Sequence, residues 1–437
     1  MELSFRKTSP LRYAVGMFGT SIPINMFKTY AAIYYVDKLG LSMASFSLVL
    51  FIYTFVDAID NPVYGYLSDR TRTRWGRRRP WLVIGSILLG FSFIGFYYPP
   101  SFLTGNLFFF YFLIMYIITG TLDSLVNANY GALFPDLFSG DVLRAKTNAF
   151  RQAFQLVAMI ISIALTPIVT SKLGYSNTAI VYAILGISVI LYSTFGCHEN
   201  PQYVNIEKPQ FWNTILALFK NKRFWIFGLA NAFYSAAMSL VLAAIPFYVK
   251  YALHLPASQE TILFGTVLII AISAVAIWVK LVKKFTLMPV WRTALLMLAI
   301  GFIPLYFANS ILTAILGSIL VGLGFAGVIS TMDLIGARII DEDSNKYGLR
   351  REGMYSSAMG FMNRLNGFFT SFAFFFVYTF YGFESGDAPG LNPGGAAKFL
   401  LIIFPFLLML LSFVSSQFMK FPVDEKVSEG DSHVYKA

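Results

Sequence analysis

Two long stretches without a charged residue restrict most strongly how this 437-residue chain can fold. No residue from Pro80 to Leu122 carries a charge, and none does from Thr293 to Met332. A helix needs about twenty apolar residues to cross the roughly 30 Å hydrocarbon core of a bilayer. Each stretch is therefore long enough for most of two such helices, which predicts a protein that crosses a membrane several times.

The composition of the whole chain supports this prediction and excludes a soluble protein. Hydrophobic residues make up 57% of the sequence and charged residues 13%, whereas about 25% of the residues in a soluble protein are charged. The strands of an outer-membrane barrel would alternate between apolar and polar residues, and these stretches do not alternate. We therefore expect an all-α polytopic membrane protein.

Twelve apolar segments are long enough to be transmembrane helices. They comprise residues 14–36, 42–66, 81–98, 107–134, 148–170, 178–196, 223–249, 261–281, 292–308, 311–338, 353–381 and 398–419. Six lie on each side of a polar segment, which predicts an N-terminal half (1–197), a cytoplasmic linker (198–222), a C-terminal half (223–419) and a cytoplasmic tail (420–437). Residues 211–225 mix apolar and basic side chains, so they form either an amphipathic helix at the membrane surface or an extended start of the seventh segment.

The distribution of lysine and arginine predicts the orientation of the chain. If the N-terminus is cytoplasmic, 26 of the 33 basic residues lie at cytoplasmic ends and loops. The opposite side then holds only Lys38, Lys172, Lys250 and Lys398. This bias is typical of a protein in the plasma membrane with both termini in the cytoplasm. It also explains the net charge of +11, which therefore does not indicate nucleic-acid binding.

Ionisable side chains inside the predicted segments are candidates for function, since each costs about 3 kcal/mol at the centre of a membrane helix. They are Lys28, Asp57, Asp60, Asp123, Arg151, Asp333 and Arg364. The single cysteine and the three scattered histidines offer no spacing for a metal site. We expect no cofactor and no bound metal beyond a possible sodium ion.

The second segment contains the residues that we predict to bind a cation. Asp57 and Asp60 are three residues apart, so they point about 60° apart on one face of a helix, and Asn61 shares that face. Two carboxylates and an amide oxygen suit Na⁺, and the repulsion between two carboxylates also favours binding of H⁺. Alternatively, one of the two acids only forms an ion pair with Lys28 or Arg364.

Polar residues on three other segments are candidates for contact with a solute. Asp123 and Asn127 lie one turn apart on the fourth segment, and the fifth segment offers Arg151 and Gln155. An Asp123–Arg151 ion pair would neutralise both charges inside the membrane, either as part of a binding site or as a purely structural link.

The eleventh and tenth segments add three further candidates. Asn363 and Arg364 lie close to glycines on the eleventh segment, so the asparagine either contacts the solute or only joins packed helices. Asp333 lies five residues before Arg338 at the predicted cytoplasmic end of the tenth segment. We expect a gating or structural role for it rather than contact with the solute.

The loop between the second and third segments resembles the signature of the major facilitator superfamily. Its matching residues are Gly65, Asp69, Arg70, Arg74, Gly76, Arg77 and Arg78. Gly65 lets helices approach closely, and Asp69 can accept hydrogen bonds from nearby arginines. We expect Gly65, Asp69, Arg70, Arg74 and Arg77 to form a clasp that closes the cytoplasmic side.

The longer stretch from Asp57 to Trp81 resembles the glycoside–pentoside–hexuronide cation symporters, a family that includes melibiose permease. Weaker matches occur at 130–135, with Arg144, and at 348–353. The resemblance covers essentially the whole chain. It implies two six-helix halves, a substrate site between them, and coupling to Na⁺ or H⁺.

Several family positions are altered in this sequence. The resemblance places the second cation-binding acid of the family on Asn61, with Asp60 one residue earlier. It places the family's lysine of the eleventh segment on Arg364, and its arginine of the fifth segment on Arg151. The two sugar-binding acids fall on Ser21 and Asn127, so both charges are lost. Melibiose is therefore not the expected substrate, whereas other sugars, uronides and non-sugar solutes stay open.

The leading hypothesis is cation-coupled symport of a small solute, related to sugars, by a monomer in the lipid bilayer. A transporter of an amphipathic lipid or drug is the second hypothesis, which the 45 phenylalanines and the lost acids favour slightly. An integral membrane enzyme or sensor is the third. It is disfavoured because the sequence shows no histidine cluster, Ser–His pair or phosphate-binding loop.

Overall fold

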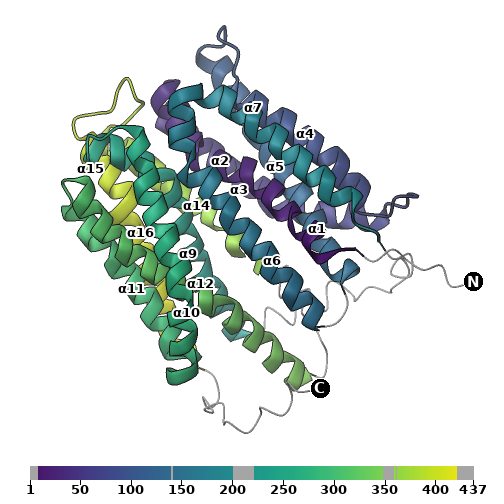
Figure 1. Cartoon of the computed structure of the whole chain (residues 1–437). Helices are drawn as coiled ribbons and strands as arrows, with labels where there is room; N and C mark the ends of the chain where they lie inside the picture. The colour runs from purple at the N-terminus through teal and green to yellow at the C-terminus, as the bar shows by residue number, and fades with distance from the viewer. Residues whose placement is uncertain (1–7, 139–140, 200–220, 348–358, 361, 421–437) are drawn as a thin grey trace, which may run out of the picture.

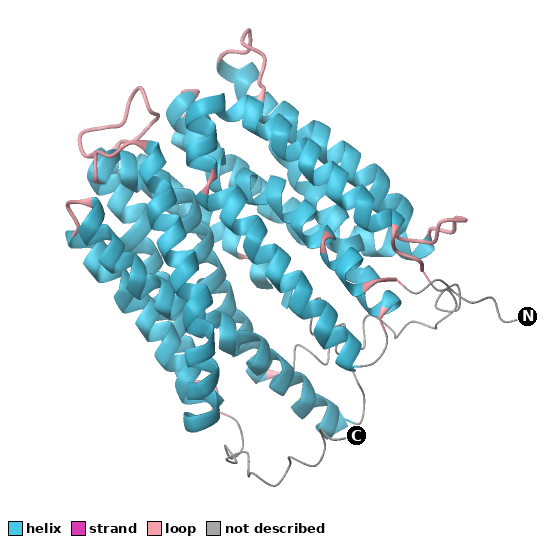
Figure 2. Cartoon of the chain, viewed as in Figure 1, coloured by secondary structure: helices cyan, strands magenta, loops and turns pink. Residues whose placement is uncertain are grey.

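A computed structural model describes residues 8–138, 141–199, 221–347, 359–360 and 362–420. These residues are almost entirely helical (Figure 2). The first group of helices is α1 (Pro10–Ala14), α2 (Gly16–Ala32), α3 (Met43–Arg70), α4 (Arg79–Tyr97), α5 (Gly105–Leu137), α6 (Asp141–Met159) and α7 (Thr166–Phe195). The second group is α9 (Lys222–Phe247), α10 (Glu260–Phe285), α11 (Leu287–Phe307), α12 (Ile311–Tyr347), α14 (Asn366–Tyr381), α15 (Pro393–Lys398) and α16 (Phe404–Gln417).

Short π-helical or 3₁₀ turns extend several of these helices. They are η1 (Ile33–Lys38) after α2, η2 (Ile160–Ala164) after α6, η4 (Tyr248–Ala252) after α9, η5 (Ala257–Gln259) before α10 and η6 (Phe399–Ile403) before α16. A helix is present within each of the twelve predicted segments, so the predicted all-α architecture is confirmed. Residues 200–220 of the predicted linker, the tail from 421, and residues 353–358 and 361 of the eleventh segment lie outside the described residues.

Nine helices within the described ranges are long and apolar enough, by length and composition, to cross a membrane. The predicted segments 14–36, 148–170 and 353–381 have no separate helix among these nine. The first is divided between α2 and η1, the second is divided among α6, η2 and the start of α7, and the third runs partly over residues that the structure leaves undescribed.

Gly174 marks the boundary between the predicted fifth and sixth segments. Its φ of 77° and ψ of 167° are not helical, so α7 consists of two helices that meet at this residue. The first, from Thr166, continues η2, and the second runs to Phe195. A residue with a Cβ atom is strained at this positive φ, which glycine adopts readily.

The two groups of helices lie side by side (Figure 1). They meet where α3 contacts α14, α2 contacts α9 and η2 contacts α10. We call the end of the bundle that carries η1 and η4 the Asp37 end. The opposite end, where α4 and α9 begin, is the linker end. The predicted cation-binding and solute-binding residues lie on helices that run between these two ends.

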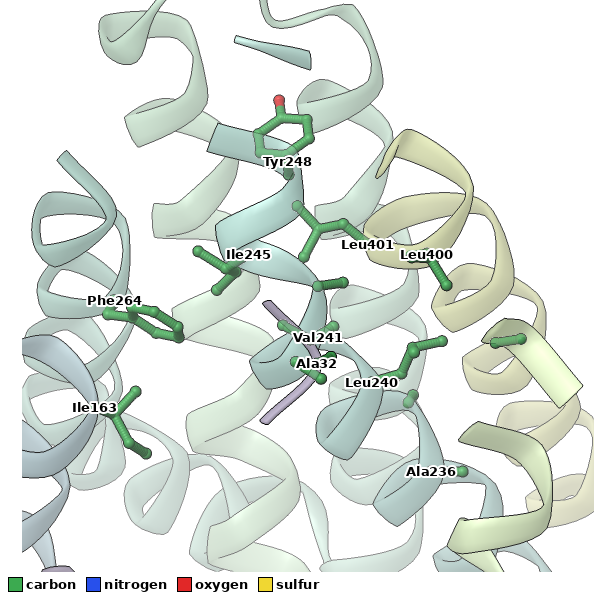
Figure 3. Packing of buried hydrophobic residues seen from close by; sticks show 14 of the residues in the cluster. Ala32, Ile163, Ala236, Leu240, Val241, Ile245, Tyr248, Phe264, Leu400 and Leu401 are labelled. Carbon is green, nitrogen blue, oxygen red and sulfur yellow. The ribbon is translucent and has the colours of Figure 1, made fainter. Parts of the chain in front are cut away.

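Small and branched apolar residues fill the contact between the groups. Ala32 of α2 belongs to the same buried cluster as Leu240, Val241 and Ile245 of α9, and Figure 3 shows these side chains close together. On the other side of α2, the Tyr30 hydroxyl donates a hydrogen bond of 2.6 Å to the Ile163 carbonyl of η2. This packing holds α2 between η2 and α9.

Candidate functional site

A cavity of about 510 Å³ lies between the two groups of helices. Seven of the residues predicted from the sequence line it: Ser21, Asp57, Asp123, Asn127, Gln155, Asn363 and Arg364. They come from α2, α3, α5, α6 and the helical residues just before α14. The structure therefore brings Asp57, one of the candidate cation-binding residues, and most of the candidate solute-binding residues around one space.

The Arg364 guanidinium bridges the two carboxylates of α3. Its Nη1 donates to the Asp57 carboxylate and to the Asp57 carbonyl, and lies 3.4 Å from Oδ1 of Asp60. Asp57 also accepts hydrogen bonds from the hydroxyls of Tyr53 at 3.2 Å and Ser124 at 3.3 Å. The two acids thus face the same partner, as their spacing predicts, and Arg364 contacts both of them rather than one.

The three charged side chains of this cluster are largely shielded from solvent, so their charges interact strongly. The side chains of Asp57, Asp60 and Arg364 are 23%, 6% and 18% exposed. Two carboxylates and one guanidinium leave one negative charge, so the cluster can attract a monovalent cation. Asn61 lies on α3 next to Asp60, but its side chain is outside the described part of the structure.

Lys28 is the partner of Asp123. The Lys28 Nζ lies 3.7 Å from Oδ2 of Asp123, and the Asn127 amide donates to Oδ1. The predicted ion pair between Asp123 and Arg151 is therefore wrong. The charge of Asp123 is balanced instead from α2, which contacts α5 directly.

Arg151 lies against aromatic rings of the first group of helices. Its guanidinium carbon is 5.1 Å from the ring centre of Phe134, 5.4 Å from that of Tyr130 and 5.9 Å from that of Tyr13. Such cation–π contacts stabilise a guanidinium without a carboxylate. Arg151 is not among the described residues that line the cavity, although the sequence placed it there.

At the linker end, two acids hold the arginine-rich loop before α4. Asp136 of α5 accepts hydrogen bonds from Arg77 Nη2 at 2.9 Å and from Arg78 Nε at 3.2 Å. Glu199 accepts from the backbone N–H groups of Arg77, Arg78 and Arg79 at 2.9 to 3.0 Å. These contacts join elements of the first group, whereas the sequence predicted a clasp that closes the cytoplasmic side.

The other predicted gating residues lie on α3, on α12 or in the loop after α3. Arg70 and Arg74 are exposed at the linker end. Gly65 and Asp69 lie on α3 and Asp333 lies on α12. The side chains of Asp69 and Asp333 are outside the described part of the structure, as are the surroundings of Gly65. Two acids that hold the arginine-rich loop were not predicted from the sequence. Asp136 directly follows the family match at 130–135, and Glu199 follows the sixth segment.

At the Asp37 end, polar contacts join the two groups of helices directly. The Asp37 carboxylate, only 3% exposed, accepts hydrogen bonds from Lys250 Nζ at 2.6 and 2.7 Å and from the Tyr251 hydroxyl. The Gly386 N–H donates to the Val36 carbonyl at 3.0 Å, and the Met43 N–H donates to the Glu384 carbonyl at 2.6 Å. This closure could not be predicted from the sequence, because Asp37 and Lys250 lie at segment ends where charges are common.

Comparison with protein families identifies the kind of molecule to which this geometry belongs. A model of the family described as "MFS/sugar transport protein" matches residues 12–425, which is nearly the whole chain. The chain belongs to this family. It is therefore a multi-pass membrane transporter of the major facilitator type and not an enzyme, as the sequence predicted.

Individual relatives agree with the family. An uncharacterized symporter of Synechocystis sp. is 31% identical over 203 residues, which cover 44% of this chain and 37% of the relative. The isoprimeverose transporter of Lactiplantibacillus pentosus is 26% identical over 363 residues, which cover 80% of this chain and 75% of the relative. A crystal structure of the nucleoside transporter NupG superposes with a TM-score of 0.69 at 13% identity, covering 94% of this chain and 99% of NupG. The last similarity shows the fold alone.

Proposed function

We propose that this transporter carries a sugar-like solute together with Na⁺ or H⁺ by alternating access. One observation carries the proposal: the cavity between the two groups of helices is lined by Asp57, whose partner Arg364 also contacts Asp60, and by a wall of hydroxyl and amide side chains. A cation and a solute bound there would occupy adjacent parts of the same space, which is what coupling requires.

The cation site in this proposal consists of Asp57, Asp60 and the side chain of Asn61. The one negative charge left by Arg364 is neutralised when a monovalent cation binds. Because Asp57 belongs to α3 and Arg364 directly precedes α14, any change in their contact is transmitted to the place where the two groups meet. Cation binding would then bias the movement of one group against the other.

The solute site faces α2, α5, α6 and the residues before α14. A volume of about 510 Å³ lies in the range of small-molecule sites. Ser21, Asn127, Gln155 and Asn363 supply hydroxyl and amide groups, which form hydrogen bonds with uncharged hydroxyls. The relative from Lactiplantibacillus pentosus is, by its name, a transporter of isoprimeverose, which supports a sugar-like solute here.

The contacts at the Asp37 end support a closed outer side in this conformation. We place the Asp37 end outside the cell and the linker end in the cytoplasm, in agreement with the distribution of basic residues. The protein acts as a monomer in the plasma membrane in this proposal, because one chain supplies every residue of the site.

Ligand binding to the purified protein tests the proposal. Thermal unfolding is measured with isoprimeverose, lactose and a lysophospholipid, each with and without Na⁺ and at two pH values. We expect a sugar to raise the unfolding temperature, and its effect to depend on Na⁺ or on low pH. The cation dependence should disappear in Asp57→Asn but persist in the control Asp387→Asn, whose carboxylate is exposed. Stabilisation by the lysophospholipid and by no sugar would contradict the proposal and favour lipid transport.

A further inference from the structure

Lys28 is a lysine on an interior helix whose ammonium group nevertheless meets open space. Its side chain is 60% exposed, and it lines the cavity together with Ser21 and Asn25 of the same helix face. A charged side chain within a membrane helix is costly unless it serves a pathway or a site. No family position assigned Lys28 a role, so its exposure into the cavity requires its own explanation.

The distance between Lys28 and Asp123 leaves both groups available to a ligand. A charge-assisted N–H···O hydrogen bond is about 2.7–2.9 Å long, whereas Nζ and Oδ2 are 3.7 Å apart. A hydroxyl oxygen lies about 2.7 Å from a carboxylate and about 2.9 Å from an amine. One hydroxyl group can therefore reach both, donating to Asp123 and accepting from Lys28.

The charges of the pair select against an acidic ligand. Lys28 and Asp123 together carry no net charge. A carboxylate or sulfonate that bound Lys28 would lie within a few ångströms of the Asp123 carboxylate, which is only 10% exposed, and like charges at that distance repel each other. An uncharged hydroxyl meets no such repulsion.

Lys28 and Asp123 also lie nearer the Asp37 end than Ser21 and Asn127, the positions on which the two sugar-binding acids of the family fall. On α2, Lys28 is seven residues, or about 10 Å, beyond Ser21 in the direction of η1. The start of α5 is at the Asp37 end too, where the ring of Phe108 stacks on Tyr35 of η1 at 5.7 Å. Asp123 is therefore about 6 Å nearer that end than Asn127. On both helices the charged residue therefore lies closer to the Asp37 end than the family position does.

An aromatic surface lies on the same side of the cavity. Tyr53 of α3 and Tyr116 of α5 both line it, and their ring centres are 5.2 Å apart. Tyr116 is two helical turns from Asp123 on the same helix, toward the Asp37 end. Rings beside a donor and an acceptor suit a sugar, which has an apolar ring face and polar hydroxyls.

We infer that Lys28 and Asp123 jointly bind a hydroxyl group of the transported solute and select uncharged sugars over acidic ones. This inference rests on the proposed function, since it concerns recognition within the same cavity. It makes Lys28 and Asp123, rather than Ser21 and Asn127, the residues that determine specificity.

Binding by purified variants tests the inference, with isoprimeverose as the uncharged probe and glucuronate as the acidic probe. Lys28→Met and Asp123→Asn should each weaken isoprimeverose binding about 10- to 100-fold, the effect of losing a hydrogen bond to a charged group. Asp123→Asn should in addition strengthen glucuronate binding, because Lys28 then lacks its carboxylate. Lys398→Met is the matched control, since its Nζ donates to the Tyr306 carbonyl outside the cavity.

A double variant separates loss of binding from loss of folding. The double variant Lys28→Met/Asp123→Asn removes both charges together, so it should fold even if a single variant does not, and it too should lose isoprimeverose binding. Unchanged isoprimeverose binding in these variants, or preference of the wild type for glucuronate, would overturn the inference while leaving the proposed function intact. A wild type that binds neither these probes nor lactose would overturn the proposed function and the inference with it.

Discussion

Replacing Asp37 with asparagine should open the Asp37 end of the protein. The Asp37 carboxylate joins the two groups of helices through Lys250 and Tyr251. Asparagine has nearly the same shape but lacks the charge, so Lys250 loses its ion pair and the hydrogen bond from the Tyr251 hydroxyl loses its charged acceptor. A hydrogen bond to a charged group contributes about 1.5–3 kcal/mol, and the part from Lys250 is reduced because its side chain is 48% exposed.

We therefore assign about 2 kcal/mol to the charge of Asp37, which corresponds to a roughly 30-fold shift toward conformations open at this end. Accessibility of a cysteine placed in the cavity measures the shift. Ser239→Cys, on α9, serves as the probe in a Cys197→Ser background. A membrane-impermeant thiol reagent is applied separately to each side of oriented vesicles.

The labelling rate from the outer side should rise by about the same factor of 30 in Asp37→Asn. The control is Glu384→Gln in the neighbouring loop, because Glu384 takes part through its carbonyl, which the substitution preserves. Equal labelling rates in Asp37→Asn and in the parent protein would refute the reasoning that this ion pair keeps the outer end closed.

Three more substitutions have defined outcomes. Arg364→Ala should destabilise the protein by about 3–5 kcal/mol, because Asp57 and Asp60 lose the guanidinium that contacts both of them, and Arg364→Lys should recover part of the loss in thermal unfolding. Gly76→Ala should lower the unfolding temperature, because Gly76 has a φ of 104° and an added Cβ would lie 2.5 Å from the Glu199 carboxylate; equal unfolding temperatures would contradict this. Asp136→Asn should increase proteolysis of the loop before α4, since Arg77 and Arg78 lose their charged acceptor, and an unchanged cleavage rate would count against it.

Much of the fold could be predicted because a bilayer demands long apolar helices. The predicted segments follow the helices closely where one helix spans the membrane without interruption, as with 81–98 and α4. Interruptions were harder to foresee. The π-helical turns after α2 and α6 leave the apolar pattern intact, so the sequence does not reveal where the helix changes its form.

Part of the site could be predicted, because charged side chains on a membrane helix face the protein interior and not the lipid. This argument brought Asp57, Asp123 and Arg364 to the cavity correctly. The same reasoning did not predict which charged side chains contact each other. The positions of the charges in the sequence do not show that Arg151 packs against aromatic rings or that Lys28 lies near Asp123. Pairing depends on how the helices rotate and pack against each other, which the spacing of residues along one helix does not determine.

Uptake by proteoliposomes tests the central claim, coupled transport through this cavity, most directly. The purified protein is reconstituted, and accumulation of labelled isoprimeverose or lactose is followed under an inward gradient of Na⁺ or of H⁺. The account predicts that one of the sugars accumulates above its external concentration under one of the gradients, and that Asp57→Asn abolishes the accumulation. Accumulation that is equal without any gradient, or that persists in Asp57→Asn, would contradict it.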